Sequence, residues 1–96
     1  MVHVRHKFNR KVATSVEFED DLTKVYYHST PVVSFNPEKI ILDSGGWKTA
    51  TTKKRMNQVA REFNLGDLGV WQKKGDWFVE YKGKKMPFRD GMELSR

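Results

Sequence analysis

The sequence predicts an α+β fold: an antiparallel sheet of about six strands with one helix inserted after the fourth strand (ββββαββ). Three observations indicate it, namely alternating apolar and polar residues, one helical apolar stripe, and turn residues between short apolar runs. A partly open OB-like barrel is the alternative, because it also holds a helix between runs of strands. The 96 residues suit one domain at residues 12–96, preceded by a flexible basic arm at residues 1–11.

Two hairpins are expected before the helix. Residues 12–18 alternate apolar and polar side chains, which predicts a strand with one buried face, and its partner is expected at residues 22–28. The runs at residues 31–35 and 40–43 flank a type I turn that has Asn36 at its first position and Pro37 at its second. The apolar run from Ile40 to Leu42 predicts a central strand covered on both faces.

One helix is predicted in the middle of the chain. Its apolar stripe recurs at helical spacing and comprises Met56, Val59, Ala60 and Phe63. Thr51 or Thr52 is expected to supply the N-cap hydroxyl. The helix is expected to end near Phe63 or Asn64, with Gly66 in the left-handed capping conformation.

A last hairpin is expected after the helix, with strands at residues 70–73 and 77–82 around Lys74-Gly75-Asp76. In its second strand, Trp77, Val79 and Tyr81 share one face. Residues 86–88 fit a short final strand, and the tail after residue 91 has no predicted structure.

The start of the predicted helix is electrostatically unusual. Its first turn would hold Lys53, Lys54 and Arg55, although the positive end of the helix dipole favours acids there. Folding gives no reason for these cations, whereas a bound phosphate would. The glycine pair at residues 45–46 fits either a phosphate or a tight connection. The segment is not a Walker A loop, because Trp47 interrupts the required Gly-Lys-Thr order.

Positive charge is concentrated in two parts of the chain. The net charge is +6, and residues 1–11 hold four cations and no acid. Residues 12–43 hold two cations and six acids, whereas residues 44–96 hold twelve cations and six acids. This distribution is typical of a surface that faces a polyanion, although a generic basic protein is the simpler interpretation.

The candidate nucleic-acid-binding residues are cations with nearby hydroxyls and an aromatic ring. Trp71 and Trp77 also lie between the cations, but tryptophan in a small domain more often belongs to the core. Asn57 and Gln58 could contact bases, although a solvated helix face is preferred for them. The candidate residues are Trp47, Lys48, Thr51, Thr52, Lys53, Lys54, Arg55, Arg61, Lys73, Lys74, Lys82, Lys84 and Lys85.

Signals for catalysis are weak. The sequence has no nucleophile elbow, no HExxH segment and no cysteine, so no catalytic residue, cofactor or thiolate metal site is expected. His3 and His6 lack partner ligands for a metal, and the acids at residues 17–21 resemble a solvated turn. A magnesium-dependent nuclease at that turn is a minor alternative. No membrane span or secretory signal is expected.

Residues 41–58, which contain GGW-x-T-x-TTK-x-RMNQ, resemble a family of small uncharacterised proteins encoded by tailed bacteriophages. In that family a strand, a Gly-Gly-Trp, a run of threonines and a Lys-x-Arg-Met-Asn-Gln helix occur in the same order. The resemblance covers residues 31–79 and leaves out the arm and first hairpin. It implies a phage protein acting in the host cytoplasm and transfers no catalytic residue.

Three functions follow from these observations. The leading hypothesis is non-catalytic binding of nucleic acid, DNA or RNA, through the helix start, the last hairpin and the arm. The alternative is a phage protein that binds and modulates a host protein, whose acidic surface would meet the same cations. A structural virion component is the third.

Overall fold

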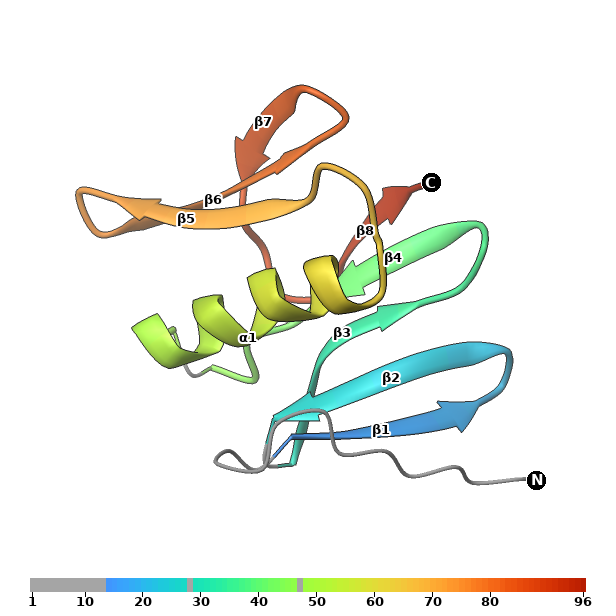
Figure 1. Ribbon diagram of the computed structural model, residues 1–96. Helices are drawn as coiled ribbons and strands as arrows, with labels where there is room; N and C mark the ends of the chain where they lie inside the picture. The colour runs from blue at the N-terminus through green and yellow to red at the C-terminus, as the bar shows by residue number, and fades with distance from the viewer. Residues whose placement is uncertain (1–13, 28, 47) are drawn as a thin grey trace.

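The computed structural model describes residues 14–27, 29–46 and 48–96, so the predicted arm lies outside the described residues. It confirms the α+β class and the single helix after the fourth strand (Figure 1). In place of one sheet of about six strands, eight strands form two antiparallel sheets, of five and three strands. The helix lies between the two sheets in Figure 1, an arrangement distinct from the alternative of one partly open barrel.

The five-stranded sheet has the order β1-β2-β3-β4-β8. Its strands are β1 (Thr14–Glu19), β2 (Leu22–Tyr27), β3 (Thr30–Phe35), β4 (Lys39–Leu42) and β8 (Met92–Ser95). The first four were predicted, but β8 comes from the tail that had no predicted structure. It pairs antiparallel with β4, and Met92 and Leu94 point into the core from alternate positions.

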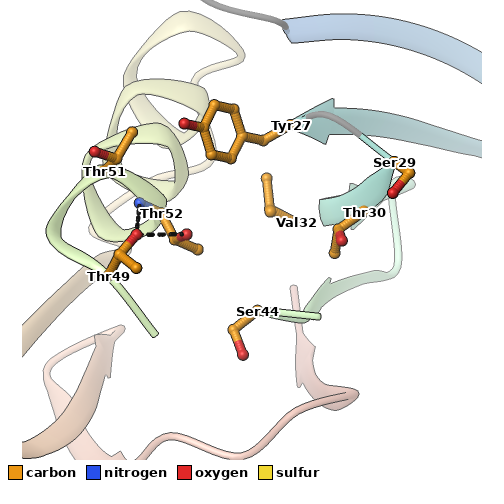
Figure 2. Close-up of a pocket in the computed structure, with 8 residues that line it drawn as sticks. All are labelled: Tyr27, Ser29, Thr30, Val32, Ser44, Thr49, Thr51 and Thr52. Atoms are coloured by element: carbon orange, nitrogen blue, oxygen red, sulfur yellow. Dashed lines mark hydrogen bonds between the residues drawn. The ribbon is translucent and has the colours of Figure 1, made fainter. Parts of the chain in front are cut away.

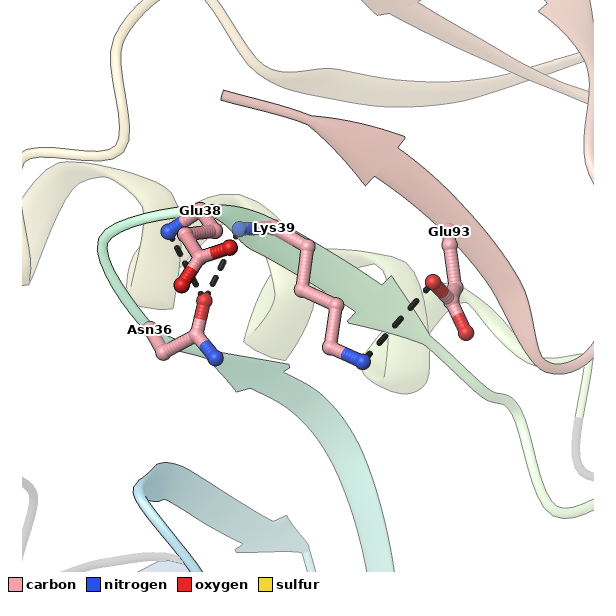
Figure 3. A network of polar contacts seen from close by, with 4 residues as sticks. All are labelled: Asn36, Glu38, Lys39 and Glu93. Atoms are coloured by element: carbon pink, nitrogen blue, oxygen red, sulfur yellow. Dashed lines mark hydrogen bonds and ion pairs between the residues drawn. The ribbon is translucent and has the colours of Figure 1, made fainter.

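The chain turns between β3 and β4 at the predicted position, and the Asn36 side chain closes the turn (Figure 3). The Asn36 side-chain oxygen accepts from the backbone N–H groups of Glu38 and Lys39, at 2.8 and 2.9 Å. β4 lies between β3 and β8, but only Ile40 and Leu42 are buried. Ile41 is partly exposed, so the expectation of a strand covered on both faces was wrong.

The three-stranded sheet consists of β5 (Gly69–Lys73), β6 (Asp76–Tyr81) and β7 (Lys84–Pro87), in that order. Its inner face contributes Val70, Trp77, Val79 and Tyr81 to the core, as the alternation predicted for the last three. Two-residue turns at Lys74-Gly75 and Lys82-Gly83 join the strands, and all four residues have positive φ. This conformation is the type I′ turn that matches the twist of a hairpin.

The helix α1 (Ala50–Glu62) buries Met56, Val59 and Ala60, which confirms the predicted stripe. Phe63, just after the helix, packs on Phe35 of β3 with 5.2 Å between ring centroids. These residues form one hydrophobic cluster with both sheets. The helix therefore holds the two sheets to a common core.

The predicted start of the helix was wrong by two residues. Thr49 is the N-cap: its side chain accepts from the backbone N–H of Thr52 at 3.2 Å. The first intrahelical bond runs from the N–H of Lys53 to the carbonyl of Thr49. The three consecutive cations therefore lie beyond the first three residues of the helix, where the dipole penalises them less. The electrostatic conflict that suggested a phosphate at the free amides is correspondingly weakened.

The helix ends where the sequence predicted, with Phe63 as its C-cap, but the residue in the left-handed capping position differs from the prediction. Asn64, with φ of 54°, occupies the left-handed position that was expected for Gly66. The N–H of Leu65 bonds to the carbonyl of Ala60 at 2.9 Å, and that of Asn64 to the carbonyl of Arg61 at 3.4 Å. These two bonds make a Schellman motif, whose apolar residue, Leu65, is buried. Asparagine is the residue after glycine that tolerates this conformation best.

Candidate nucleic-acid interface

The connection from β4 to α1 is tied to the connection from β7 to β8. The backbone N–H and the hydroxyl of Ser44 both donate to Asp90 Oδ1, at 2.8 and 2.7 Å. Gly45 has a φ of 63°, and a Cβ there would lie 2.7 Å from Thr30 Cγ2. Gly45 is therefore required for close packing of the connection on β3. Trp47, the aromatic candidate of this segment, lies outside the described residues.

Two candidate lysines from this region lie against the three-stranded sheet. Lys53 donates to the side-chain oxygen of Gln72 at 2.8 Å, and its Nζ stands 5.5 Å from the centroid of the Trp77 ring. Lys48 Nζ stands 5.9 Å from the ring centroid of Phe88, beside the end of the β5–β6 hairpin. The structure thus brings the cations near the helix start together with that hairpin.

The other candidates on α1 point in different directions. Lys54 is exposed, whereas Arg55 is partly buried and donates to the side-chain oxygen of Gln58. Arg61 is exposed in the last turn, where a cation complements the helix dipole. Thr51 is exposed, but Thr52 is fully buried and its hydroxyl bonds to that of Thr49. Thr52 therefore serves packing and capping, so its assignment to a binding surface was wrong.

Asn57 has a structural role that neither interpretation of the sequence foresaw. Its side-chain amide donates to the carbonyl of Val70 at 2.9 Å, and its side-chain oxygen accepts from the N–H of Val70 at 2.8 Å. This pair of bonds satisfies the outward backbone groups of β5, which is an edge strand. Asn57 is thereby unavailable to bases, and it fastens the three-stranded sheet to the helix.

The hairpin lysines fall into two groups at opposite ends of β6. Lys73 and Lys74 lie at the β5–β6 turn, which Figure 1 places at the same end of the molecule as the start of α1. Lys82, Lys84 and Lys85 lie at or beside the β6–β7 turn. All five are exposed. The cations therefore flank the three-stranded sheet at both ends and do not converge on one point.

The two tryptophans of this sheet face opposite ways. Trp77 is 5% exposed in the core, in agreement with the preferred interpretation. Trp71 is partly exposed on the outer face, where its ring stacks on Phe78 with 5.8 Å between centroids and 26° between planes. Alternation along each strand could not show that Trp71 and Phe78 share a face, because that depends on the pairing register, which puts the two residues opposite each other.

Charge is divided between the two sheets. Residues 14–42 carry five acids and two lysines, whereas residues 69–87 carry five lysines and two acids. The two lysines pair with acids of their own sheet: Lys24 lies 2.7 Å from Glu19, and Lys39 lies 3.9 Å from Glu93. The hydrogen bond to Glu19 raises the pKa of Lys24. In the described part of the chain, no carboxylate forms an ion pair with the cations of α1 or the three-stranded sheet.

A pocket of about 440 Å³ lies beside the start of α1 (Figure 2). Its described lining residues contribute mainly hydroxyl groups, and those of Thr49, Thr52 and Ser44 already have hydrogen-bond partners. None of the lining residues that the structure describes supplies a carboxylate, imidazole or amine, so these eight side chains offer no acid and base pair for catalysis. The lining residues are Tyr27, Ser29, Thr30, Val32, Ser44, Thr49, Thr51 and Thr52.

The described residues contain neither a metal-ligand cluster nor a membrane-spanning helix. Among them, no group of three or more His, Asp or Glu side chains is arranged to hold a metal ion, and His3 and His6 lie outside the described residues. Within the same residues, no helix has the length and apolar character needed to cross a membrane.

The family model described as Kyanoviridae Gp96 protein matches residues 2–95. The match includes the arm and the first hairpin, which the motif resemblance had left out. It supports the broader expectation of a phage protein family. No curated protein and no solved structure matches the chain.

Proposed function

We propose that this chain, which belongs to the Kyanoviridae Gp96 protein family, a family of phage proteins, binds nucleic acid in the host cytoplasm without catalysing a reaction. One observation carries the proposal, namely the division of charge between the two sheets. The acidic sheet pairs both of its lysines internally, and the basic side retains its charge. We define the basic side as the exposed cations Lys48, Lys54, Arg61, Lys73, Lys74, Lys82, Lys84 and Lys85 together with the partly buried Lys53 and Arg55.

Self-repulsion among these cations opposes folding, and nothing in the described core requires them. A polyanion would relieve the repulsion and release condensed counterions, which is the main source of affinity in non-specific nucleic-acid binding. Lys53 can also attract a phosphate, although its side chain has two partners. These partners, the Gln72 amide and the Trp77 ring, are both neutral and leave the positive charge of Lys53 uncompensated. The basic side therefore suits a chain of phosphates better than a single anion.

The test is the salt dependence of binding to a fluorescein-labelled oligonucleotide, measured by fluorescence anisotropy. The affinity should fall steeply as salt rises. Replacing a phosphate-contacting lysine should reduce the slope of log Kobs against log salt by about one. Lys74→Ala and Lys85→Ala are the variants to use, because both side chains are exposed and have no ion pair within the described residues.

Lys39→Ala is the matched control. It removes the same charge from the five-stranded sheet, where Lys39 lies beside Glu93 (Figure 3). The salt slope of this variant should equal that of the unchanged protein. Binding that stays flat between low and high salt, or an equal change of slope in all three variants, would overturn the proposal.

The alternative is a phage protein that binds a host protein, in which the same basic side would meet an acidic protein surface. Affinity capture from host lysate separates the two functions when the lysate is treated with nuclease. A stoichiometric protein that remains bound after nuclease, together with no salt-dependent binding of oligonucleotide, would favour the host-protein function.

A further inference from the structure

We propose that the outer face of the three-stranded sheet is a stacking platform for the bases of single-stranded nucleic acid. The platform is the row formed by Trp71, Phe78 and Pro87 across β5, β6 and β7. The inference rests on the proposed function and adds the class of nucleic acid that the protein prefers. It also assigns the affinity to two separate sources, stacking on the platform and charge on the basic side.

The register of the sheet creates the platform. Trp71 pairs with Phe78, and Phe78 pairs with Pro87, so the three side chains project from the same face at neighbouring positions. Two interstrand spacings span about 10 Å, and because the two rings stack on one another, a base would add to the stack that they form. The Trp71 and Phe78 rings are close to parallel, and both are partly exposed. Pro87 is exposed at the end of the row.

Core packing does not account for this row. The core takes Val70, Trp77 and Val79 from the opposite face, and the helix contacts the edge of β5 through Asn57. On the outer face, Trp71 and Phe78 both keep part of their surface in contact with solvent, and Pro87 is exposed. An aromatic ring on an open sheet face gives up part of its hydrophobic stabilisation, and a stacked base would restore it.

The charge around the platform favours a nucleic acid over an apolar protein segment. Lys73 and Lys85 lie on the same face, one on each edge strand, and Lys74 and Lys82 lie in the adjoining turns. Two acids share the face, and each is the cross-strand partner of a lysine: Asp76 of Lys73, and Glu80 of Lys85. Across residues 69–87 the lysines still outnumber the acids by five to two.

Stacking on these rings requires unpaired bases. In a duplex each base is covered above and below by its neighbours, so a flat protein ring reaches only a strand whose bases are splayed outward. Single strands satisfy this condition, and every base has a ring face, so the preference should be broad in sequence. The platform therefore predicts tighter binding of a single strand than of a duplex of the same length.

The test uses a labelled oligothymidylate of about 12 nucleotides, a duplex of equal length, and an abasic strand that keeps the phosphates. Trp71→Ala should weaken binding of the oligothymidylate by about 5- to 150-fold, the range for loss of one base stack. Its affinity for the abasic strand and its salt slope should not change. Trp71→Phe keeps a ring and should restore most of the affinity. Trp71→Leu, which keeps apolar bulk without a ring, serves if the alanine variant does not fold.

Phe18→Ala is the matched control, because Phe18 is 43% exposed on the acidic sheet. It should leave both affinities unchanged. If the salt test succeeds but Trp71→Ala and Trp71→Leu bind oligothymidylate like the unchanged protein, the platform is overturned and the proposed function stands. If the unchanged protein binds no oligonucleotide at any salt concentration, both proposals fail, and the row is better explained as a contact for a protein.

Discussion

The five-stranded and three-stranded sheets use the same hairpin turn with opposite charge. Asp20-Asp21 joins β1 to β2 with both residues at positive φ, as Lys74-Gly75 and Lys82-Gly83 do in the other sheet. Glycine takes the second position in both basic turns and is absent from the acidic one. Because the two turn residues have positive φ in both sheets, hairpin geometry does not explain the division of charge.

The sheets also differ in how they are held. The five-stranded sheet gains β8 from a distant part of the chain, so β4 is paired on both sides. In the described part of the chain no further strand pairs with β5, and the side chain of Asn57 bonds to its edge at Val70 instead. The two sheets share one hydrophobic core, but the β5 edge is held by side-chain bonds from the helix, whereas β4 is held by strand pairing on both sides.

The largest expected effect that sharpens this contrast comes from Asn57→Ala. Loss of both bonds to Val70 leaves a backbone donor and acceptor without a protein partner, which should lower the free energy of unfolding by about 3 kcal/mol. Hydrogen exchange should accelerate more at β5 than at β2 and β3. Gln72→Ala, which removes an exposed bond from Lys53, is the control and should cost far less. Equal loss of protection in both sheets would contradict the contrast.

The connections between the sheets provide the next test. Gly45→Ala should cost about 2 kcal/mol in a chemical denaturation measurement, because it adds a left-handed alanine and a clash with Thr30. Gly46 also has positive φ, but a Cβ there meets nothing within 4 Å, so Gly46→Ala should cost about 1 kcal/mol. If Gly45→Ala and Gly46→Ala were equally stable, close packing of the connection on β3 would contribute nothing to the free energy of unfolding.

The smallest effect concerns the turns themselves. Asp21→Gly should raise the stability by about 0.5 kcal/mol, since glycine adopts positive φ without strain and one of two adjacent like charges disappears. The reverse change, Gly83→Asp, places aspartate in a turn with open space around the added Cβ and should lower the stability by a similar amount. Thermal denaturation of both variants measures the two changes in stability. If both variants were stabilised, or both destabilised, the acidic and basic turns would not be equivalent.

Much of the fold was predictable because its signals are local. Apolar and polar alternation, short apolar runs and turn residues together located six of the strands, and the stripe of Met56, Val59 and Ala60 located the helix. The helix start was missed because Thr49, Thr51 and Thr52 can all cap a helix. Only packing selects among them, since burial of Thr52 leaves Thr49 as the N-cap. Likewise, no local pattern distinguished Asn64 from Gly66 at the other end.

The candidate site was predictable in its charges and less so in its arrangement. The sequence by itself determined which side chains are basic and that the last hairpin reverses direction at Lys74-Gly75. It also determined that Trp77 shares a face with Val79. Tertiary structure alone decided that β8 completes the acidic sheet, that Asn57 binds β5, and that Trp71 faces outward beside Phe78. The physical reason is that periodicity reports each strand separately, whereas pairing register and the choice of buried face depend on residues far away in the chain.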